Sequence, residues 1–213
     1  RNKSLKVLNN INFKFESGKV YSIVGPSGSG KSTLLNLLSL IDIPSSGFIE
    51  YNNKKIDTNS TIENDSIRSK NIGIIYQDKN LLADFTALEN VLFPSLLVTK
   101  DKKKSIDLAK KLIKQFGLNF RFNHFPSELS GGENQRIAIA RAIINEPNVI
   151  LADEPTGSLD FDNAKQIFKI LFNLKNKNRI IIFATHNRYF ANMADCKIKM
   201  IGGKMNISNE RIN

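Results

Sequence analysis

The sequence has a single cysteine, Cys196, among its 213 residues, which excludes an internal disulfide. It also lacks any apolar run of roughly 18 residues, the length that a membrane-spanning helix needs, so no transmembrane helix is predicted. No signal-peptide pattern is visible at the start, although the first residue is not methionine. These absences favour a protein of a reducing compartment that does not cross a membrane.

Acidic residues are outnumbered, with 20 Asp and Glu against 31 Lys and Arg, for a net charge of +11 at pH 7. Such a charge can indicate nucleic acid or an anionic membrane as a partner. The basic residues are mostly lysine, however, and nucleic-acid sites favour arginines interleaved with aromatic residues, a pattern that we do not find. No nucleic-acid partner is therefore expected. The run Lys100 to Lys104 is interpreted as the start of a solvated helix face in preference to a lipid contact.

Glycine is concentrated at one point, where residues 25–32 read GPSGSGKS and fit the pattern G-x-x-x-x-G-K-[ST]. The apolar run Val20 to Val24 before it predicts a buried strand, and Ser32 to Ile41 after it has a helical apolar face. A strand, a glycine loop and a helix in this order aim backbone N–H groups at phosphate oxygens. The sequence therefore predicts a nucleotide phosphate site formed by Gly25, Pro26, Ser27, Gly28, Ser29, Gly30, Lys31, Ser32 and Thr33. Lys31 is expected to reach the β- and γ-phosphates, and Ser32 to bind Mg²⁺.

Two adjacent carboxylates end the next apolar run, Val149 to Ala152, which predicts a strand buried in a parallel sheet. Asp153 is expected to hold Mg²⁺, and Glu154 to polarise the water that attacks the γ-phosphate. A solvated acidic pair is the alternative, and the phosphate loop makes it the weaker interpretation.

A second glycine-rich turn, LSGGE at Leu129 to Glu133, precedes a helical pattern that continues through Ile144. The N–H groups of Ser130, Gly131 and Gly132 would open this helix and face an anion. One phosphate loop needs one such turn, so two turns indicate a triphosphate held between two copies of the chain. His186 follows a predicted buried strand, Arg179 to Ala184, and is expected to donate a hydrogen bond to the γ-phosphate. His124 is interpreted as a loop residue.

Strand patterns at residues 5–24, 47–51 and 72–76 alternate with helical ones, which predicts an α/β fold with a largely parallel sheet. Residues 1–213 are expected to form a single domain. Its core lobe would comprise about 1–80 and 130–213, and a helical lobe about 81–129 would be inserted between them. Further helices and a closing hairpin are predicted at Thr86–Leu97, Ser105–Phe116, Asn163–Leu174 and Ile198–Met205.

Six motifs in this order resemble those of the ATP-binding subunit of an ABC transporter, over the whole chain. They are GPSGSGKS (Walker A), Gln77 in GIIYQDKN (Q-loop), LSGGENQ (signature), ILADE (Walker B), Ser158–Leu159–Asp160 (D-loop) and His186 (H-loop). Asn134 departs from the family, which more often has glutamine, arginine or lysine there.

The resemblance implies a P-loop NTPase fold of the ABC ATPase type. That fold has a mostly parallel core sheet, an N-terminal antiparallel β part and an inserted helical lobe. It also implies an ATP hydrolase that uses ATP and Mg²⁺ and forms a head-to-tail homodimer in the ATP-bound state. By this resemblance Glu154, His186 and Gln77 are the catalytic residues, and Ser32, Gln77 and Asp153 are the magnesium ligands.

The stretches Tyr76–Pro94 and Phe125–Asp160 resemble most closely the ATPase of the lipoprotein-releasing Lol system. That resemblance implies integral membrane subunits as partners and a peripheral location on the cytoplasmic face of the bacterial inner membrane. The segment after Gln77 would face those subunits, or it would only pack the helical lobe. An ATPase of a macrolide-exporter or cell-division complex is an alternative, and a soluble ABC ATPase acting on DNA or ribosomes is a weaker one. The family's adenine-stacking aromatic would fall just before Arg1, so Phe13 and Phe15 are assigned to the core.

Overall fold

The computed structural model describes residues 6–57 and 60–208, and its centre is a six-stranded sheet. The strand order is β4 (Ile72–Ile75), β5 (Val149–Asp153), β6 (Ile180–Ala184), β1 (Val20–Val24), β7 (Cys196–Ile201) and β8 (Lys204–Ser208). Every neighbouring pair is parallel except the hairpin β7–β8, which turns at Gly202–Gly203. The largely parallel sheet and the closing hairpin predicted from the sequence are confirmed.

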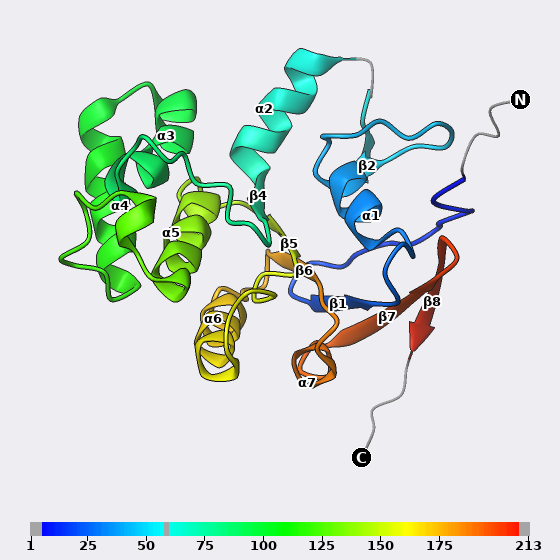
Figure 1. Ribbon diagram of the computed structural model, residues 1–213. Helices are drawn as coiled ribbons and strands as arrows, with labels where there is room; N and C mark the ends of the chain where they lie inside the picture. The colour runs from blue at the N-terminus through cyan, green and yellow to red at the C-terminus, as the bar shows by residue number, and fades with distance from the viewer. Residues whose placement is uncertain (1–5, 58–59, 209–213) are drawn as a thin grey trace, which may run out of the picture.

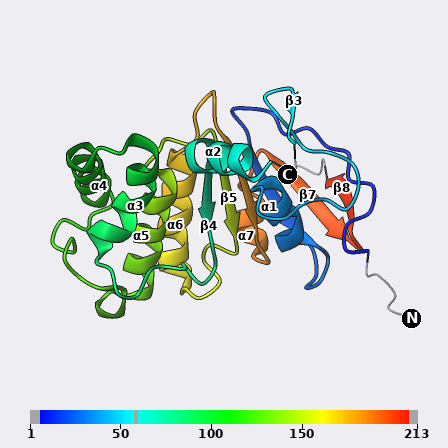
Figure 2. The same ribbon diagram turned by 90° about the horizontal axis from the view of Figure 1, so that it is seen from above.

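Helices cover both faces of this sheet (Figures 1 and 2). One face carries α1 (Lys31–Leu38) and α2 (Thr61–Asn71), and the other carries α6 (Phe161–Asn173) and α7 (Arg188–Ala191). Strand β6 illustrates why two layers form: Ile181 and Phe183 face the cluster that contains α6, whereas Ile182 packs with the residues of α1. Successive side chains of a strand point to opposite faces, so an unbroken apolar run needs cover on both.

The helical end of the molecule consists of α3 (Ala87–Thr99), α4 (Lys102–Gln115), a short 3₁₀ turn (Pro126–Glu128) and α5 (Gly131–Ile143). Helix α5 belongs to two clusters, because Ile139 packs toward the sheet and α6 whereas Ile137 packs against α3 and α4. It therefore joins the helical end to the strands that carry the acidic residues.

Two local predictions at the N-terminal side need correction. No strand occurs in residues 6–19, where the alternating phenylalanines predicted one. Phe13 and Phe15 instead pack edge-on against Tyr21, with ring centroids 5.9 and 5.0 Å from it, which confirms their assignment to the core. The strand expected at 47–51 is reduced to β2 (Glu50–Tyr51), which pairs antiparallel with β3 (Lys54–Lys55). Residue 5, with which the predicted strand segment 5–24 begins, lies outside the described residues.

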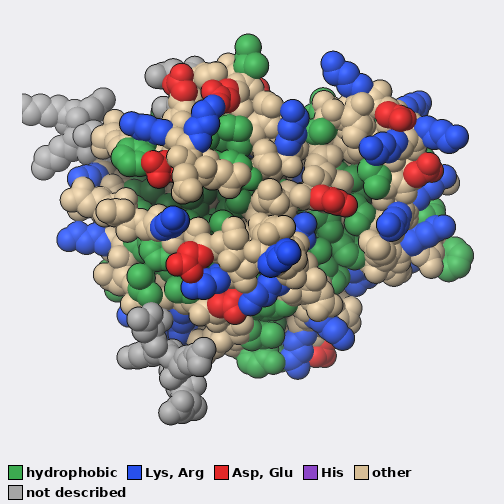
Figure 3. All heavy atoms as spheres, turned by 180° about the vertical axis from the view of Figure 1, so that it is seen from behind, with side chains coloured by type: hydrophobic (Ala, Val, Ile, Leu, Met, Phe, Trp, Pro, Cys, Tyr) green, Lys and Arg blue, Asp and Glu red, His purple; other side chains and the backbone are tan. Residues whose placement is uncertain are grey.

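A helix begins at the lysine run, as the sequence predicted. Helix α4 starts at Lys102, capped by Asp101, and its first three lysines are exposed. Figure 3 shows one face of the molecule, on which basic side chains are scattered among acidic and uncharged ones and are densest at the edge formed by α3 and α4. Among the described residues, no helix has the length and apolar character that crossing a bilayer requires.

Candidate functional site

The phosphate loop joins the end of β1 to the start of α1, as the sequence predicts. Gly30 caps α1 in the left-handed region at φ 98°, and a Cβ there would lie 2.7 Å from Leu8 Cδ2. A Cβ on Gly25 would lie 2.2 Å from the carbonyl oxygen of Met200 in β7. The loop is thus pressed against the neighbouring strand, and glycine is required at both positions.

Lys31 folds back over this loop. Its Nζ donates to the carbonyl oxygens of Gly25 at 3.0 Å and Pro26 at 3.2 Å, and the residue is only 7% exposed. Ser29 is buried as well, and its Oγ has no hydrogen-bond partner among the described residues. A buried ammonium group and an unpartnered hydroxyl in a glycine loop are the groups that an anion would satisfy.

The acidic pair lies at the end of β5, where Ala184 of β6 accepts a hydrogen bond from the backbone N–H of Glu154 at 3.0 Å. Glu154 has φ 44°, in the left-handed region that only a few per cent of residues other than glycine occupy. Its carbonyl oxygen accepts from the N–H of Gly157 at 3.0 Å, so this conformation is held from both sides. Backbone strain of this kind is concentrated at functional sites.

The carboxylate of Glu154 lies against His186, which follows β6. His186 donates its backbone N–H to Oε2 at 3.3 Å, and its Nε2 lies 3.3 Å from Oε1. Burial raises the pKa of Glu154, while the hydrogen bond from His186 and the nearby charge of Lys31 oppose this shift. The structure therefore brings Lys31 and His186 to the adjacent pair Asp153 and Glu154, from three distant parts of the sequence.

The segment after β4 is fastened to this centre by three contacts. Gln77 packs on the turn after Glu154, since a Cβ on Gly157 would lie 3.0 Å from its Nε2. The Nζ of Lys79 donates to Ser158 Oγ at 2.6 Å. Arg141 of α5 donates to the carbonyl oxygens of Lys79 and Asn80, at 2.7 and 2.6 Å. Neither Lys79 nor Arg141 was predicted from the sequence, because their hydrogen-bond partners are 61 to 79 positions away.

The second glycine turn caps α5 through a capping box, which was not predicted from the sequence. Ser130 Oγ accepts from the N–H of Glu133 at 3.2 Å, and Glu133 Oε2 accepts from the N–H of Ser130 at 2.8 Å. Arg121 also donates to Glu133, whose pKa is lowered to about 2 chiefly by the hydrogen bond from the Ser130 backbone. The expectation that the N–H of Ser130 faces an external anion is thus corrected, since it is engaged within the helix. The Ser-x-x-Glu spacing is the signal for this capping box.

The two glycine turns do not meet within one chain. Figures 1 and 2 place α5 and α1 on opposite sides of the strands β4 and β5. At the start of α5, a Cβ on Gly131 or Gly132 would contact Leu159 or Asn163, which lie just after the acidic pair. His124, the other histidine, lies in the loop before the 3₁₀ turn, and its Nε2 is 3.2 Å from Arg121 Nη1.

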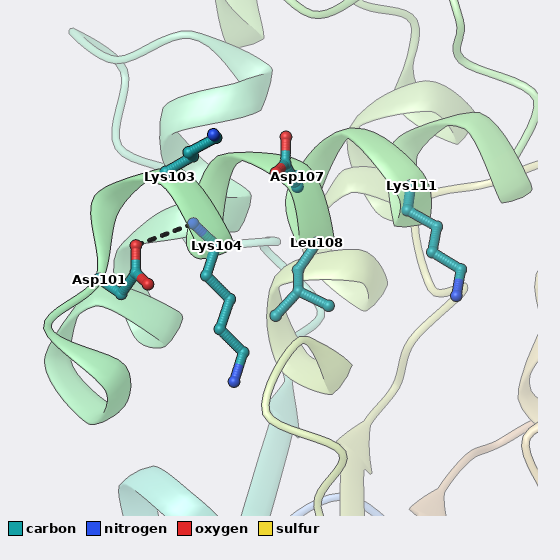
Figure 4. Close-up of a pocket in the computed structure, with 6 residues that line it drawn as sticks. All are labelled: Asp101, Lys103, Lys104, Asp107, Leu108 and Lys111. Carbon is teal, nitrogen blue, oxygen red and sulfur yellow. Dashed lines mark hydrogen bonds between the residues drawn. The ribbon is translucent and has the colours of Figure 1, made fainter.

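A hollow of about 400 Å³ lies well away from these residues, on the outer face of α4 (Figure 4). It is lined by Asp101, Lys103, Lys104, Asp107, Leu108 and Lys111. In the close-up the lysines extend outward from the helix and the only bond between the residues drawn is the cap of Asp101. This hollow is a surface feature of the solvated helix face.

Comparison with known proteins places this arrangement in a family. The sequence profile of the ABC transporter family matches residues 8–157. The chain belongs to the ABC transporter family. The lipoprotein-releasing system ATP-binding protein LolD of Cytophaga hutchinsonii is 41% identical, over 94% of this chain and 92% of that protein. The protein of the same name from Wigglesworthia glossinidia brevipalpis is 44% identical, over 95% and 89%.

A solved structure of the same family is similar throughout. It is the dimeric structure of a post-hydrolysis state of the ATP-binding cassette MJ0796 bound to ADP and Pi. The TM-score is 0.86 at 35% identity, with 94% of this chain and 90% of that chain covered. The predicted ABC ATPase fold is confirmed, and the protein is an ATP-binding, ATP-hydrolysing domain of an ABC transporter.

Proposed function

We propose that this ABC ATPase powers the release of lipoproteins from the bacterial inner membrane toward the outer membrane. The observation that carries the proposal is its similarity, at 41 to 44% identity over at least 94% of the chain, to four proteins named as lipoprotein-releasing system ATP-binding protein LolD. The protein would then sit peripherally on the cytoplasmic face of that membrane, bound to the integral membrane subunits of the complex.

One relative of similar identity has a name that assigns it to no particular transport system. An uncharacterized ABC transporter ATP-binding protein of Methanocaldococcus jannaschii, MJ1508, is also 44% identical, over 93% of this chain and 88% of that protein. Co-purification of the tagged chain from detergent-solubilised membranes tests the choice. Recovery of the lipoprotein-releasing membrane pair supports the proposal, and recovery of a macrolide-exporter or cell-division membrane subunit transfers the chain to that sister group.

The nucleotide phosphates fit the loop of residues 25–33. The unpartnered Oγ of Ser29 and the buried Nζ of Lys31 supply donors, and the start of α1 adds backbone N–H groups. Lys31 now satisfies its Nζ with two carbonyl oxygens of its own loop, at 3.0 and 3.2 Å. A bound phosphate would replace these neutral acceptors with charged ones, which form the stronger hydrogen bonds.

Mg²⁺ would bind to Ser32, Gln77 and Asp153, with phosphate oxygens and water completing its coordination. Among the described residues, no cluster of three or more His, Cys, Asp or Glu side chains could hold a metal ion by itself. Beside nucleotides, Mg²⁺ is usually bound through one or two carboxylates and the substrate phosphates. When bound, the ion would neutralise charge that develops on the phosphate oxygens.

Glu154 is the group in this chain best placed to accept a proton from an attacking water. Its carboxylate is largely buried, with 15% of the side chain exposed, and burial raises its pKa. A raised pKa makes a carboxylate a stronger base as long as it remains ionised at neutral pH. His186, in contact with that carboxylate, would orient it and donate to the γ-phosphate, and Gln77 would help to position the water and the ion.

The start of α5 would complete the site of a second copy. Within one chain it lies across the sheet from the phosphate loop, and the similar cassette MJ0796 forms dimers. A head-to-tail homodimer would present Ser130, Gly131 and Gly132 to the partner's γ-phosphate. The side chain of Ser130 and the N–H groups of the two glycines would make these contacts, since the N–H of Ser130 is engaged by Glu133.

The membrane subunits would dock beside the Q-loop, at the surface formed by Leu82 and Phe85. Both side chains are exposed, at 47% and 38%, whereas the neighbouring Leu81 packs into the helical cluster. The buried side chain of Asn90 holds the loop by bonding the backbone of Leu82, at 2.8 and 3.0 Å, and the carbonyl oxygen of Phe85 at 2.9 Å. A rigid apolar surface joined to Gln77 suits the transmission of docking to the ATP site. We propose that the single domain consists of a core lobe, about 1–80 and 130–213, and a helical lobe of about 81–129 that begins at this surface.

A further inference from the structure

An apolar groove lies between α6 and α7, on the face of the sheet opposite to α1 (Figure 1). It has a volume of about 300 Å³, and its lining includes Lys165, Phe168, Lys169, Phe172, Tyr189 and Met193. None of these residues belongs to the six motifs of the ATP site.

The floor of the groove is aromatic and tightly packed. The rings of Phe168 and Phe190 stack with their centroids 4.1 Å apart and an interplanar angle of 15°, and each residue is 1% exposed. Phe172 lies beside them, 6.2 Å from Phe168. A floor fixed in this way keeps its shape before anything binds, which lowers the entropic cost of binding.

The rim of the groove exposes three large apolar side chains close to one another. Tyr189 is 53% exposed, Met193 49% and Phe161 48%. The Phe161 ring lies 5.5 Å from that of Tyr189 and 5.8 Å from that of Phe190, so the rim and the floor form one continuous surface. Contiguous exposed apolar surface of this kind marks an interaction site.

The charge at the groove has a single sign. Lys165 and Lys169 stand one helical turn apart on α6, and both are exposed. The Nζ of Lys165 lies 4.5 Å over the ring of Phe161, and neither lysine has an ion pair with a described residue. No carboxylate lines the groove. A ligand that inserts apolar groups here would therefore gain from negative charge at its flanks.

We propose that this groove docks an acidic peptide segment of a partner protein, with a bulky apolar side chain on the aromatic floor and flanking carboxylates over Lys165 and Lys169. A volume of about 300 Å³ accommodates one or two side chains, the usual size of an interface anchor. An anionic membrane fits less well, because lipid-binding surfaces carry clusters of roughly four to eight basic residues and this groove has two.

The position of the groove connects it to the ATP site. Helix α6 is capped by Asp160, the last residue of the D-loop motif, and α7 is capped by Asn187, the neighbour of His186. A partner bound between these helices would contact both of the segments that leave the catalytic centre. The surface is separate from that of Leu82 and Phe85, and the inference holds whichever membrane subunits the chain serves.

Fluorescence anisotropy with three short labelled peptides tests the proposal. One peptide has phenylalanine and leucine flanked by glutamates, a second replaces the two apolar residues with alanine, and a third replaces the glutamates with lysines. The first is expected to bind about tenfold more tightly than the other two. Equal binding of the first and second peptides would overturn the apolar anchor, and equal binding of the first and third would overturn the charge match.

Charge-reversal variants of the two rim lysines test whether the peptide binds at this groove or at another basic surface. Lys165→Glu with Lys169→Glu should weaken the acidic peptide about tenfold and strengthen the basic one. The matched control, Lys110→Glu with Lys111→Glu on the exposed face of α4, should change neither. Equal effects of the two double variants would show non-specific electrostatics and overturn the proposal. It is also overturned if the rim variant leaves peptide binding intact but loses ATP-dependent self-association or binding to vesicles of anionic phospholipid, because the groove then serves a second copy or a membrane.

Discussion

The Nε2 of His186 lies 3.3 Å from Oε1 of Glu154, and the backbone N–H of His186 donates to the other oxygen of the same carboxylate. The two residues follow the ends of neighbouring parallel strands, β5 and β6, so the register of the sheet creates this contact. Burial raises the pKa of Glu154, and His186 partly offsets that effect. Burial therefore makes the ionised form of Glu154, the proposed catalytic base, costly for the folded state.

Glu154→Gln should raise the melting temperature at pH 7. The raised pKa means that the folded state binds this proton more tightly than the unfolded chain does, so ionisation costs stability as pH rises above the ordinary value of 4.5. Glutamine avoids that cost, and each 1 kcal/mol gained corresponds to about 2–4 °C for a chain of this size. The advantage should vanish near pH 4, where the carboxyl group is protonated in both states.

Thermal denaturation at the two pH values measures this difference. Asp107→Asn, at an exposed position on α4, is the control and should behave like the parent at both. A Glu154→Gln protein that is less stable than the parent at pH 7 would show that the carboxylate is stabilising and would contradict the burial argument.

Glu133→Ala should lower stability at pH 7 by about 1 kcal/mol, the usual value of a helix cap. The pKa of Glu133 is lowered to about 2, so its contribution is complete above the ordinary value of 4.5 and is lost as pH falls toward 2. The difference from the parent in unfolding free energy, measured with urea, should therefore shrink between pH 5 and pH 3. Glu133→Gln keeps an acceptor oxygen but not the charge, so its unfolding free energy at pH 7 should lie between those of the parent and Glu133→Ala. A difference between parent and Glu133→Ala that does not change with pH would refute the electrostatic contribution.

Local sequence predicted those parts of the fold whose signals are local. The spacing of Ile167, Ile170 and Leu171 predicted α6, and Gly202–Gly203 predicted the turn of the hairpin. The strand predicted in the N-terminal segment was wrong. Phe13 and Phe15 alternate as in a strand, but ring contacts with Tyr21 hold them in place without strand pairing. Helix α2 was missed since it is polar and Ile62 is 84% exposed.

The candidate site likewise combines features with a local sequence signal and features without one. Its six motifs are short and were recognised directly, whereas the contacts that join them depend on tertiary structure. Nothing in the sequence near Lys79 indicates Ser158, and the left-handed backbone of Glu154 follows from the turn that crosses to β6. The residues that we propose for the chemistry could therefore be read from the sequence, but the contacts that position them could not.

Leu82→Asp with Phe85→Asp should weaken binding to the membrane subunits by about 2 kcal/mol or more, the loss typical of an interface anchor. Both side chains are partly exposed, so the substitutions place charge on the docking surface without burying it. Basal ATP hydrolysis by the isolated domain should survive. Co-purification run beside an ATPase assay checks both expectations, with Ile62→Asp as an exposed apolar control on α2. Undiminished co-purification of the folded double variant would refute the docking surface.

Mixed dimers test whether each ATP site borrows from both chains. A subunit with Lys31→Ala paired with a subunit carrying Ser130→Arg should retain one intact site in a head-to-tail dimer, because the working phosphate loop faces the working signature turn. About half of the parent hydrolysis per dimer is expected if the sites act independently. Heterodimers without activity would show that each chain supplies its own signature turn, provided that nucleotide binding to the intact loop is retained.

The central claim is that Glu154 activates the attacking water in a site closed by two copies of the chain. Its most direct test compares Glu154→Gln with the parent for ATP binding, single-turnover hydrolysis and ATP-dependent dimer formation. The variant should bind ATP as the parent does, accumulate as an ATP-bound dimer, and hydrolyse at least about a hundredfold more slowly, the lower range of general-base catalysis. Hydrolysis near the parent rate would contradict the assignment of Glu154 as the base.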